Sequence, residues 1–446
     1  MLQTNTISRK LAKESSPVRL NLFQRLVRQW ETLHPYNGVQ ALRVRGLLDL
    51  NHCRRAWQDS IDSLGLGRVH VAKDRYHFVC LNGDTEQHTV QLCPHGTCLY
   101  EWISTELNHP FDPAQTVPFR PFLIHQQDSS WFGLTYQHWV ADSASIRRLM
   151  REWFARLFDP TAAATRPLRA GGAGYFHLFG PHRSNCSSGV AVMAYLRWHS
   201  QFRRVQRIEN PQKFAQLPAR FIHRKTEAGL IDRLVVLAKE AHVTVNDIFL
   251  AAIAQACRKY VPIHARGIRN DLAIGTIVDL RPKAPRPMDE VFNLLLGFTS
   301  ISCRPADFDS WPKLLSAVAR QTRQQKLHHT AEGSWIRMIG GLAASRWLNR
   351  HKHLELYRKR VALAGAVSNV NLNRDWPARY HPDPLLQYIR VAPTGPMTPL
   401  VFTTTTLGNT LGIGLTYRHV LIKEQWAAGI LQTFVDQLEK FVEEGT

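Results

Sequence analysis

Residues 131–158 read WFGLTYQHWVADSASIRRLMREWFARLF, and this stretch changes its backbone period near the middle. Up to Tyr136, apolar side chains alternate with small or polar ones, as they do along a strand. From Ile146 onward, apolar residues return at helical spacing. His138 and Asp142 stand between the two patterns. We therefore predict that a strand-to-helix junction presents them, a place where loops often expose reactive side chains to a cleft.

The chain has 446 residues, of which 44% are hydrophobic. That length is too great for one ordinary hydrophobic core and favours two or three domains. Segment 161–189 is rich in Gly, Pro and Ser, so we place a boundary there, with an N-terminal half over 1–175 and a C-terminal half over 176–446. Strand and helix patterns mix in both halves, which predicts an α/β (α+β) fold with a substantial sheet in each.

No apolar run reaches the roughly 18 residues of a membrane-spanning helix. The first residues, MLQTNTISRKLAKESS, contain no apolar segment of the signal-peptide kind. We expect a cytoplasmic protein. Its cysteines number seven, an odd and scattered set that indicates reduced thiols. Cys93 and Cys98 flank Pro-His-Gly-Thr, but no second ligand pair stands nearby, and structural zinc needs four ligands, so we predict no metal.

Lysine and arginine number 56 against 35 aspartate and glutamate, a formal net charge of +21. Such a charge favours anionic partners: an acidic protein, a phosphorylated co-substrate or anionic lipid. Nucleic acid is not expected, since neither zinc-finger spacing nor an aromatic RNA-binding motif is present. Residues 191–208 form a basic amphipathic pattern. It suits peripheral association with an anionic membrane or an acidic partner; packing of its apolar stripe on its own domain is the interpretation we favour.

His138 and Asp142 each have two interpretations. Imidazole titrates near neutral pH, so His138 suits a general base, but it also suits an ordinary buried histidine. Asp142 suits a carboxylate that orients the imidazole, or a cap on the helix that follows. In a chain with 21 histidines the spacing alone is not specific.

The wider context is more specific. Residues 107–157 resemble the core of the condensation-domain family of nonribosomal peptide synthetases. That family belongs with the CoA-dependent acyltransferases, such as chloramphenicol acyltransferases and wax ester synthases. Its motif is His-His-x-x-x-Asp-Gly, preceded by a P-F-D turn and a short strand start. These read Gln137-His138-Trp139-Val140-Ala141-Asp142-Ser143, Pro110-Phe111-Asp112 and Pro118-Phe119-Arg120.

The second half continues the resemblance. TVNDIFLAA (244–252) is similar to a family helix, and VDLRP (278–282) is similar to the strand that supplies an arginine, here Arg281, facing the motif aspartate. AVSNV (366–370) resembles a strand of the wax ester synthase branch and contains Asn369.

The resemblance implies two chloramphenicol acetyltransferase-like halves in a V, with a tunnel between them and His138 at mid-tunnel. It implies acyl transfer from acyl-CoA or an acidic acyl or peptidyl carrier protein to a hydroxyl or amine. No bound cofactor is implied; the thioester is a co-substrate. His138 is then the general base, and Asp142 pairs with Arg281. Ser143 and Asn369 are candidate substrate-binding residues.

Alternatives stay open. Arg281 also fits a surface arginine before Pro282, and Asn369 a turn residue. Gln137 replaces the first motif histidine, and Ser143 replaces a glycine whose N–H assists the thioester carbonyl; serine tolerates left-handed backbone less well. The rival function is a catalytically degenerate docking protein for carrier proteins or membrane.

Overall fold

The computed structural model of the protein describes residues 17–72, 74–79, 89–112, 117–163, 167–171, 174–179, 188–208, 217–284, 287–288, 290–349, 351–352 and 363–445. Its helices are α1 (Leu22–Glu31), α2 (Leu50–Leu64), α3 (Leu99–Asn108), α4 (Ser143–Phe158), α5 (Tyr175–Phe179), α6 (Ser188–Arg203), α7 (Leu230–Glu240), α8 (Val245–Tyr260), α9 (Trp311–Leu327), α10 (Trp335–Trp347) and α12 (Glu424–Glu444).

The first-half strands are β1 (Val18–Arg19), β2 (Asn37–Arg45), β3 (Arg68–Ala72), β4 (Arg75–Val79), β5 (Gln91–Leu92), β6 (Phe119–His125), β7 (Ser129–Gln137) and β8 (Arg169–Ala170). The later strands are β9 (Arg207–Ile208), β10 (Ala219–Lys225), β11 (Ile263–His264), β12 (Leu272–Asp279), β13 (Val291–Phe292), β14 (Leu296–Cys303), β15 (Gly365–Asn371), β16 (Leu385–Val391), β17 (Leu400–Leu407) and β18 (Thr410–Arg418).

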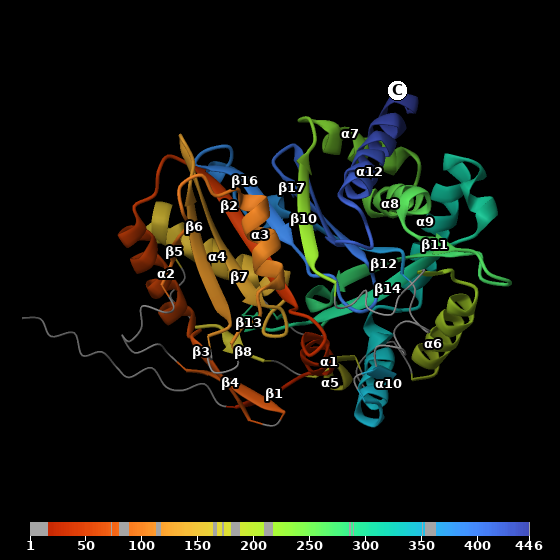
Figure 1. The fold of residues 1–446 in the computed structure, drawn as a ribbon, viewed down its shortest axis with the longest axis horizontal. Helices are drawn as coiled ribbons and strands as arrows, with labels where there is room; N and C mark the ends of the chain where they lie inside the picture. The colour runs from red at the N-terminus through yellow and green to blue at the C-terminus, as the bar shows by residue number, and fades with distance from the viewer. Residues whose placement is uncertain are drawn as a thin grey trace, which may run out of the picture.

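Two larger sheets lie side by side (Figure 1). One has five strands in the order β16-β2-β7-β6-β5, antiparallel except between β5 and β6. The other has six strands in the order β10-β18-β17-β15-β12-β14, with β15 parallel to both of its neighbours. The mixed α/β character predicted from the sequence is confirmed.

The five-stranded sheet is covered on both faces. On one face α2 and α4 pack together, with the rings of Trp57 and Trp153 4.9 Å apart. On the other face α3 lies between β2 and β10, so it bridges the two sheets. Alternate residues of β2 serve the two faces: Leu42 joins the core under α2 and α4, and Ala41 joins the core under α3. Helices α7, α8 and α12 pack on the six-stranded sheet (Figure 1).

Strand β16 belongs by sequence to the C-terminal half but pairs with β2 in the sheet of the N-terminal half. In Figure 1 the blue β16 lies beside the red β2. Ile389 stands opposite Ala41 in this pairing. The sequence pattern predicted no strand here, although it predicted the strand that leads to His138, which is β7. The boundary at 175/176 stays a prediction, and the crossing strand ties the halves together across it.

Two helices, α1 and α6, differ from what the sequence pattern predicted. Helix α1 was not predicted, although Asn21 and Gln24 form a capping box at its start. In α6 the predicted apolar stripe does not pack as one face: Phe202 is buried, whereas Val192 and Leu196 are half exposed. Packing of α6 on its own domain therefore involves its C-terminal end. The first 16 residues, Pro113 (directly after the Pro110-Phe111-Asp112 turn) and much of the predicted linker lie outside the described residues.

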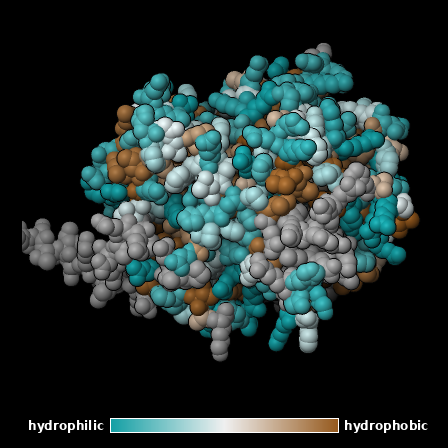
Figure 2. All heavy atoms as spheres, in the orientation of Figure 1, coloured by the Kyte–Doolittle hydropathy of each residue, from teal (hydrophilic) through white to brown (hydrophobic). Residues whose placement is uncertain are grey.

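Within the described residues, no helix combines the length and apolar character needed to cross a bilayer. The face of the molecule seen in Figure 2 is mainly hydrophilic, with separate small hydrophobic patches.

Candidate functional site

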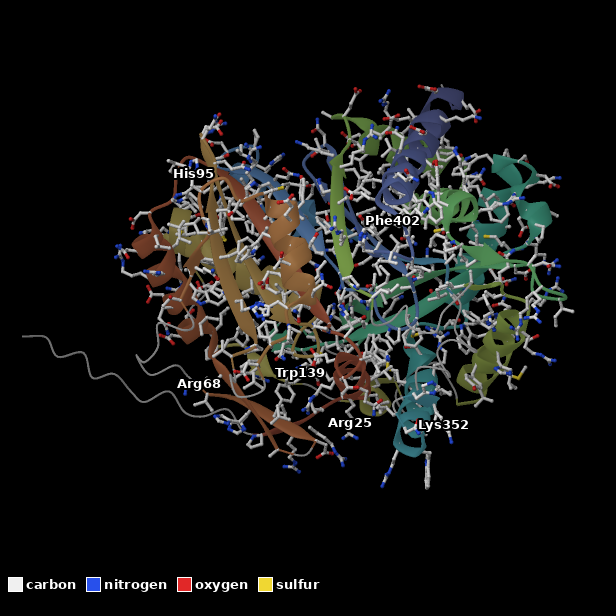
Figure 3. The ribbon with its side chains drawn as sticks, viewed as in Figure 1. Arg25, Arg68, His95, Trp139, Lys352 and Phe402 are labelled. Carbon is white, nitrogen blue, oxygen red and sulfur yellow. The ribbon has the colours of Figure 1, made fainter. Side chains whose placement is uncertain are left out.

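His138 directly follows β7, at the junction that the sequence predicted. Its backbone N–H donates to the carbonyl of Tyr36, 3.2 Å away. The imidazole lies near two phenol rings, those of Tyr36 and Tyr136, each with its centroid 5.6 Å from the imidazole centroid. The next residue, Trp139, packs on Tyr76 and lies beside α1 (Figure 3), whose Arg28 guanidinium is 5.3 Å from the centroid of the indole ring. The loop is thus anchored on both sides of His138.

The imidazole of His138 is held in its neutral form. Burial lowers the pKa of His138, while its own backbone carbonyl and the Asp142 carboxylate act in the opposite direction. Nδ1 is enclosed, with no hydrogen-bond partner of ordinary geometry among the described residues. A neutral imidazole has a lone pair available, which a general base needs.

Asp142 is fully buried and caps α4. Its Oδ1 accepts from the backbone N–H groups of Ala144 and Ser145 at 3.1 and 3.0 Å. Its Oδ2 accepts from the backbone N–H of Leu295 and from Nη1 of Arg281, both at 2.8 Å. Burial acts to raise the pKa of Asp142, but Arg281 and the backbone donors together hold that pKa below its ordinary value. Asp142 is therefore a buried carboxylate.

Arg281 lies in a short 3-10 turn, Arg281–Lys283, just after β12. Besides Asp142 it donates to the Asp279 carboxylate at 3.2 Å, to Ser145 Oγ at 2.8 Å and to the Asn293 carbonyl at 2.9 Å. The ion pair that the resemblance implied is present, and Arg281 is not a surface arginine. No hydrogen bond joins Asp142 to His138 in the described part of the chain. The geometry fits an aspartate that fixes the loop, not one that orients the imidazole.

A cavity of about 190 Å³ lies between the two sheets, and His138 lines it. The other predicted site residues that line it are Ser143 and Asn369. Ser143 is the first residue of α4, so its backbone is right-handed helical and a glycine is not required. Asn369 accepts from the Thr404 hydroxyl at 2.9 Å. Gln137 does not line this cavity but borders a separate pocket with Trp139.

Several residues of the site were missed by sequence reasoning. Tyr36 holds the His138 backbone, and Asn293 accepts from both Arg281 and Ser145. Arg390, on β16, lines the cavity and is buried. The sequence did carry one signal for it, because Arg390 interrupts an otherwise apolar strand end, YIRVAP (388–393).

A second groove, of about 780 Å³, adjoins the cavity, since Ala144, Arg147 and Asp279 line both. The groove also contains Arg148 and Arg151. Its arginines outnumber its acids, Asp279 and Asp375, so it offers an anionic group a place beside the cavity.

The described residues contain no group of three or more His, Cys, Asp or Glu that would hold a metal ion. Cys93 and Cys98 are free thiols, as are Cys53, Cys257 and Cys303.

No protein-family model matches the chain, and no curated protein matches its sequence. Solved structures do match. The first condensation domain of the CDA synthetase is 14% identical over 97% of both chains, with a TM-score of 0.66. The nonribosomal peptide synthetase FmoA3, in its α-methyl-L-serine-AMP-bound form, is 16% identical over 97% of this chain, with a TM-score of 0.66. This chain spans only 46% of that larger protein.

The X-domain in complex with OxyB from teicoplanin biosynthesis is 16% identical, with a TM-score of 0.57. The match covers 97% of this chain and 95% of the matched chain. The likeness to these structures shows the fold. The chain has the fold of condensation domains, as its sequence motifs predicted.

Proposed function

We propose that this protein is an acyltransferase that moves an acyl group from a thioester to a hydroxyl or amine. The observation that carries the proposal is the neutral His138 imidazole, which lines a cavity between the two sheets on a loop fixed by the Asp142–Arg281 pair. A weak nucleophile needs its proton removed as it attacks, and a neutral imidazole beside a cavity suits that task.

The proposed reaction uses His138 twice. The imidazole takes the proton from the acceptor O–H or N–H while the acceptor oxygen or nitrogen attacks the thioester carbonyl. The tetrahedral intermediate then collapses and its C–S bond breaks. The departing sulfur takes the proton from the imidazolium, so the products are an ester or amide and a free thiol. No metal or bound cofactor takes part in these steps.

Two donors suit the site: acyl-CoA, and an acyl or peptidyl carrier protein bearing a phosphopantetheine thioester. Both carry phosphate, and the arginine-rich groove beside the cavity suits a phosphate group. Intact-mass analysis tests the function: the protein is incubated with a panel of acyl-CoA and acyl-carrier thioesters and candidate alcohols and amines. Acyl transfer should occur with at least one pair. With His138→Ala it should fall by roughly 10²–10⁴-fold, while the thermal midpoint stays close to that of the parent.

A second candidate function is docking without catalysis. The likeness to the X-domain, which was solved in complex with OxyB, favours it. The two candidates differ in outcome: a docking protein would bind a carrier protein but transfer no acyl group to any acceptor, and His138→Ala would leave binding unaltered.

A further inference from the structure

Arg390 is a buried cation in the wall of the cavity that His138 lines. It lies on β16, the strand that crosses into the first sheet, and is 3% exposed. Its guanidinium donates to Ser143 Oγ from Nε at 2.9 Å, to Ser368 Oγ from Nη2 at 2.8 Å and to the Thr404 carbonyl from Nη1 at 3.2 Å. These partners are all uncharged.

No carboxylate among the described residues forms an ion pair with Arg390. The neighbouring Arg147 does have one, Asp375, at 2.7 Å. Two phenols lie close, but burial raises the pKa of Tyr136 and of Tyr388, so both stay neutral. Asp375 favours the charged form of Arg390 through space but is paired with Arg147, so among the described residues the positive charge of Arg390 has no counter-ion of its own.

An unbalanced buried charge is costly, and proteins ordinarily pair it. Burial lowers the pKa of Arg390 to about 9, which still leaves the guanidinium charged at neutral pH. The neighbouring arginine Arg147 also acts to lower it. Because the cation faces a cavity, a bound anion would supply the missing charge.

Ser143 adds a second donor at the same place. Its Oγ accepts from Arg390 Nε at 2.9 Å and from Gln40 Nε2 at 3.0 Å, and Arg147 Nη1 lies at 3.4 Å. A hydroxyl oxygen has two lone pairs, so these donors occupy them and leave the hydroxyl proton to be donated. Ser143 lines the cavity, and none of the described residues accepts that proton.

We propose that Arg390 and Ser143 bind a carboxylate of the acceptor substrate inside the cavity. The carboxylate would accept from a remaining Nη N–H of the guanidinium and from the Ser143 hydroxyl, two groups that the 2.9 Å hydrogen bond from Nε to Ser143 Oγ holds side by side. The acceptor is then a hydroxy acid or amino acid with a free carboxylate. This assignment to the acceptor rests on the proposed acyl transfer; the anion subsite itself rests only on the unbalanced cation.

The donor is the less suitable source of the anion. A pantetheine thioester is uncharged from its sulfur along the arm, and its phosphate comes at the far end, where it would lie in the arginine-rich groove. The exception is a dicarboxylic acyl group, so the experiment includes one.

Two matched pairs of probes test the proposal. The acceptor pair is 3-hydroxybutyrate and 3-hydroxybutyramide, which differ only in the charged group. The donor pair is succinyl and butyryl thioesters. Calorimetric binding of the acceptor pair to the parent protein needs no turnover, so it tests the subsite even if no acyl transfer is found. The carboxylate should bind at least roughly tenfold more tightly than the carboxamide, as a charge-assisted hydrogen bond warrants.

Arg390→Gln should reduce the ratio of acid to amide binding by roughly 10–100-fold, and Arg390→Lys should restore part of it. Ser143→Ala removes only the hydroxyl donor and should reduce the ratio of acid to amide binding less. If Arg390→Gln does not fold, Ser143→Ala tests the subsite in its place. The matched control is Arg418→Gln. Arg418 is as deeply buried, at 1% exposed, but donates to the Leu217 and Thr394 carbonyls and does not line the cavity.

Equal binding of acid and amide to the parent protein would overturn the subsite. A preference for succinyl over butyryl donors, without one for the acidic acceptor, would overturn the assignment to the acceptor. A third outcome would also overturn the proposal: in the Arg390 and Ser143 variants kcat falls equally with acid and amide, and the ratio of their binding affinities does not change. Arg390 and Ser143 would then act on the reacting oxygen and not on a carboxylate.

Discussion

His138 combines burial with an available lone pair. Two phenol rings enclose the imidazole, and Tyr36 fixes its backbone. Desolvation disfavours the imidazolium, so the neutral form persists to lower pH than in a free histidine. Asp142 opposes this shift only through space, since its own oxygens are taken by Arg281 and backbone donors. The residue is thus ready as a base at neutral pH.

This environment predicts the pH dependence of acyl transfer. A base must be unprotonated, so kcat/KM should fall on the acid side as His138 gains a proton. Because its pKa lies below the ordinary 6.5, the acid limb should have an apparent pKa below 6.5. Rates measured from pH 4 to pH 8 with a saturating donor check this. A limb centred at or above 6.5 would contradict the buried, neutral imidazole.

His138, Asp142 and Ser143 were predictable from sequence because they are close in the chain and carry a characteristic spacing, whereas Arg281 and Asn369 were predicted from the resemblance of the separate segments that contain them. Three of these residues line the cavity: His138, Ser143 and Asn369. The other two, Asp142 and Arg281, form the ion pair that fixes the loop. Arg390 was not predictable in that way. Its place in an otherwise apolar strand end is a signal, but in a chain with 56 Lys and Arg that signal assigns no role, and its lack of a counter-ion is visible only once its neighbours are known.

At the scale of elements, the site is a junction of pieces from both sheets. Strand β7 delivers His138, the start of α4 holds Asp142 as its cap, and the turn after β12 brings Arg281. Period and capping signals predicted these elements, since each depends on local sequence. Strand β16 escaped prediction because its partner, β2, lies more than 300 residues earlier, and such long-range pairing leaves no local signal.

The Asp142–Arg281 pair is predicted to join these elements energetically. Asp142→Asn and Arg281→Ala should each lower the free energy of unfolding by roughly 3–5 kcal/mol, because each leaves a buried partner unpaired. Denaturant unfolding of both single variants and the double variant would measure the coupling. The exposed pair Lys313–Asp309 is a control, and its coupling should stay below about 1 kcal/mol. Strict additivity at Asp142 and Arg281 would mean that the two side chains do not support each other.

At the scale of the whole molecule, the net charge of +21 raises the question of which basic residues a negatively charged donor would meet. The sequence pattern over 191–208, which includes Arg203 and Arg204, suited an anionic membrane or an acidic partner as the alternative to packing on its own domain. The structure qualifies that alternative, because Arg204 forms an ion pair with Asp271 at 3.5 Å and its replacement would also break that pair. The groove beside the cavity concentrates Arg147, Arg148 and Arg151 next to the site itself. A donor phosphate should therefore be attracted more strongly to the groove than to α6.

The last prediction concerns this charge. If a phosphate-bearing donor is attracted by the groove, donor KM should rise steeply with ionic strength, while KM of an uncharged acceptor should change little, since about 0.15 M salt screens fields beyond roughly 8 Å. Arg151 is the residue to neutralise, because it is exposed and, in the described part of the chain, donates to the Asp375 carbonyl and to no carboxylate. Arg151→Gln should raise donor KM severalfold and weaken its salt dependence.

Arg203→Gln, an equal loss of charge on exposed α6, is the control and should change neither donor KM nor its salt dependence. Steady-state kinetics from 0.02 to 0.5 M salt would make the comparison. Equal effects of the two variants would show that the net charge of the molecule matters, and not the place of the groove.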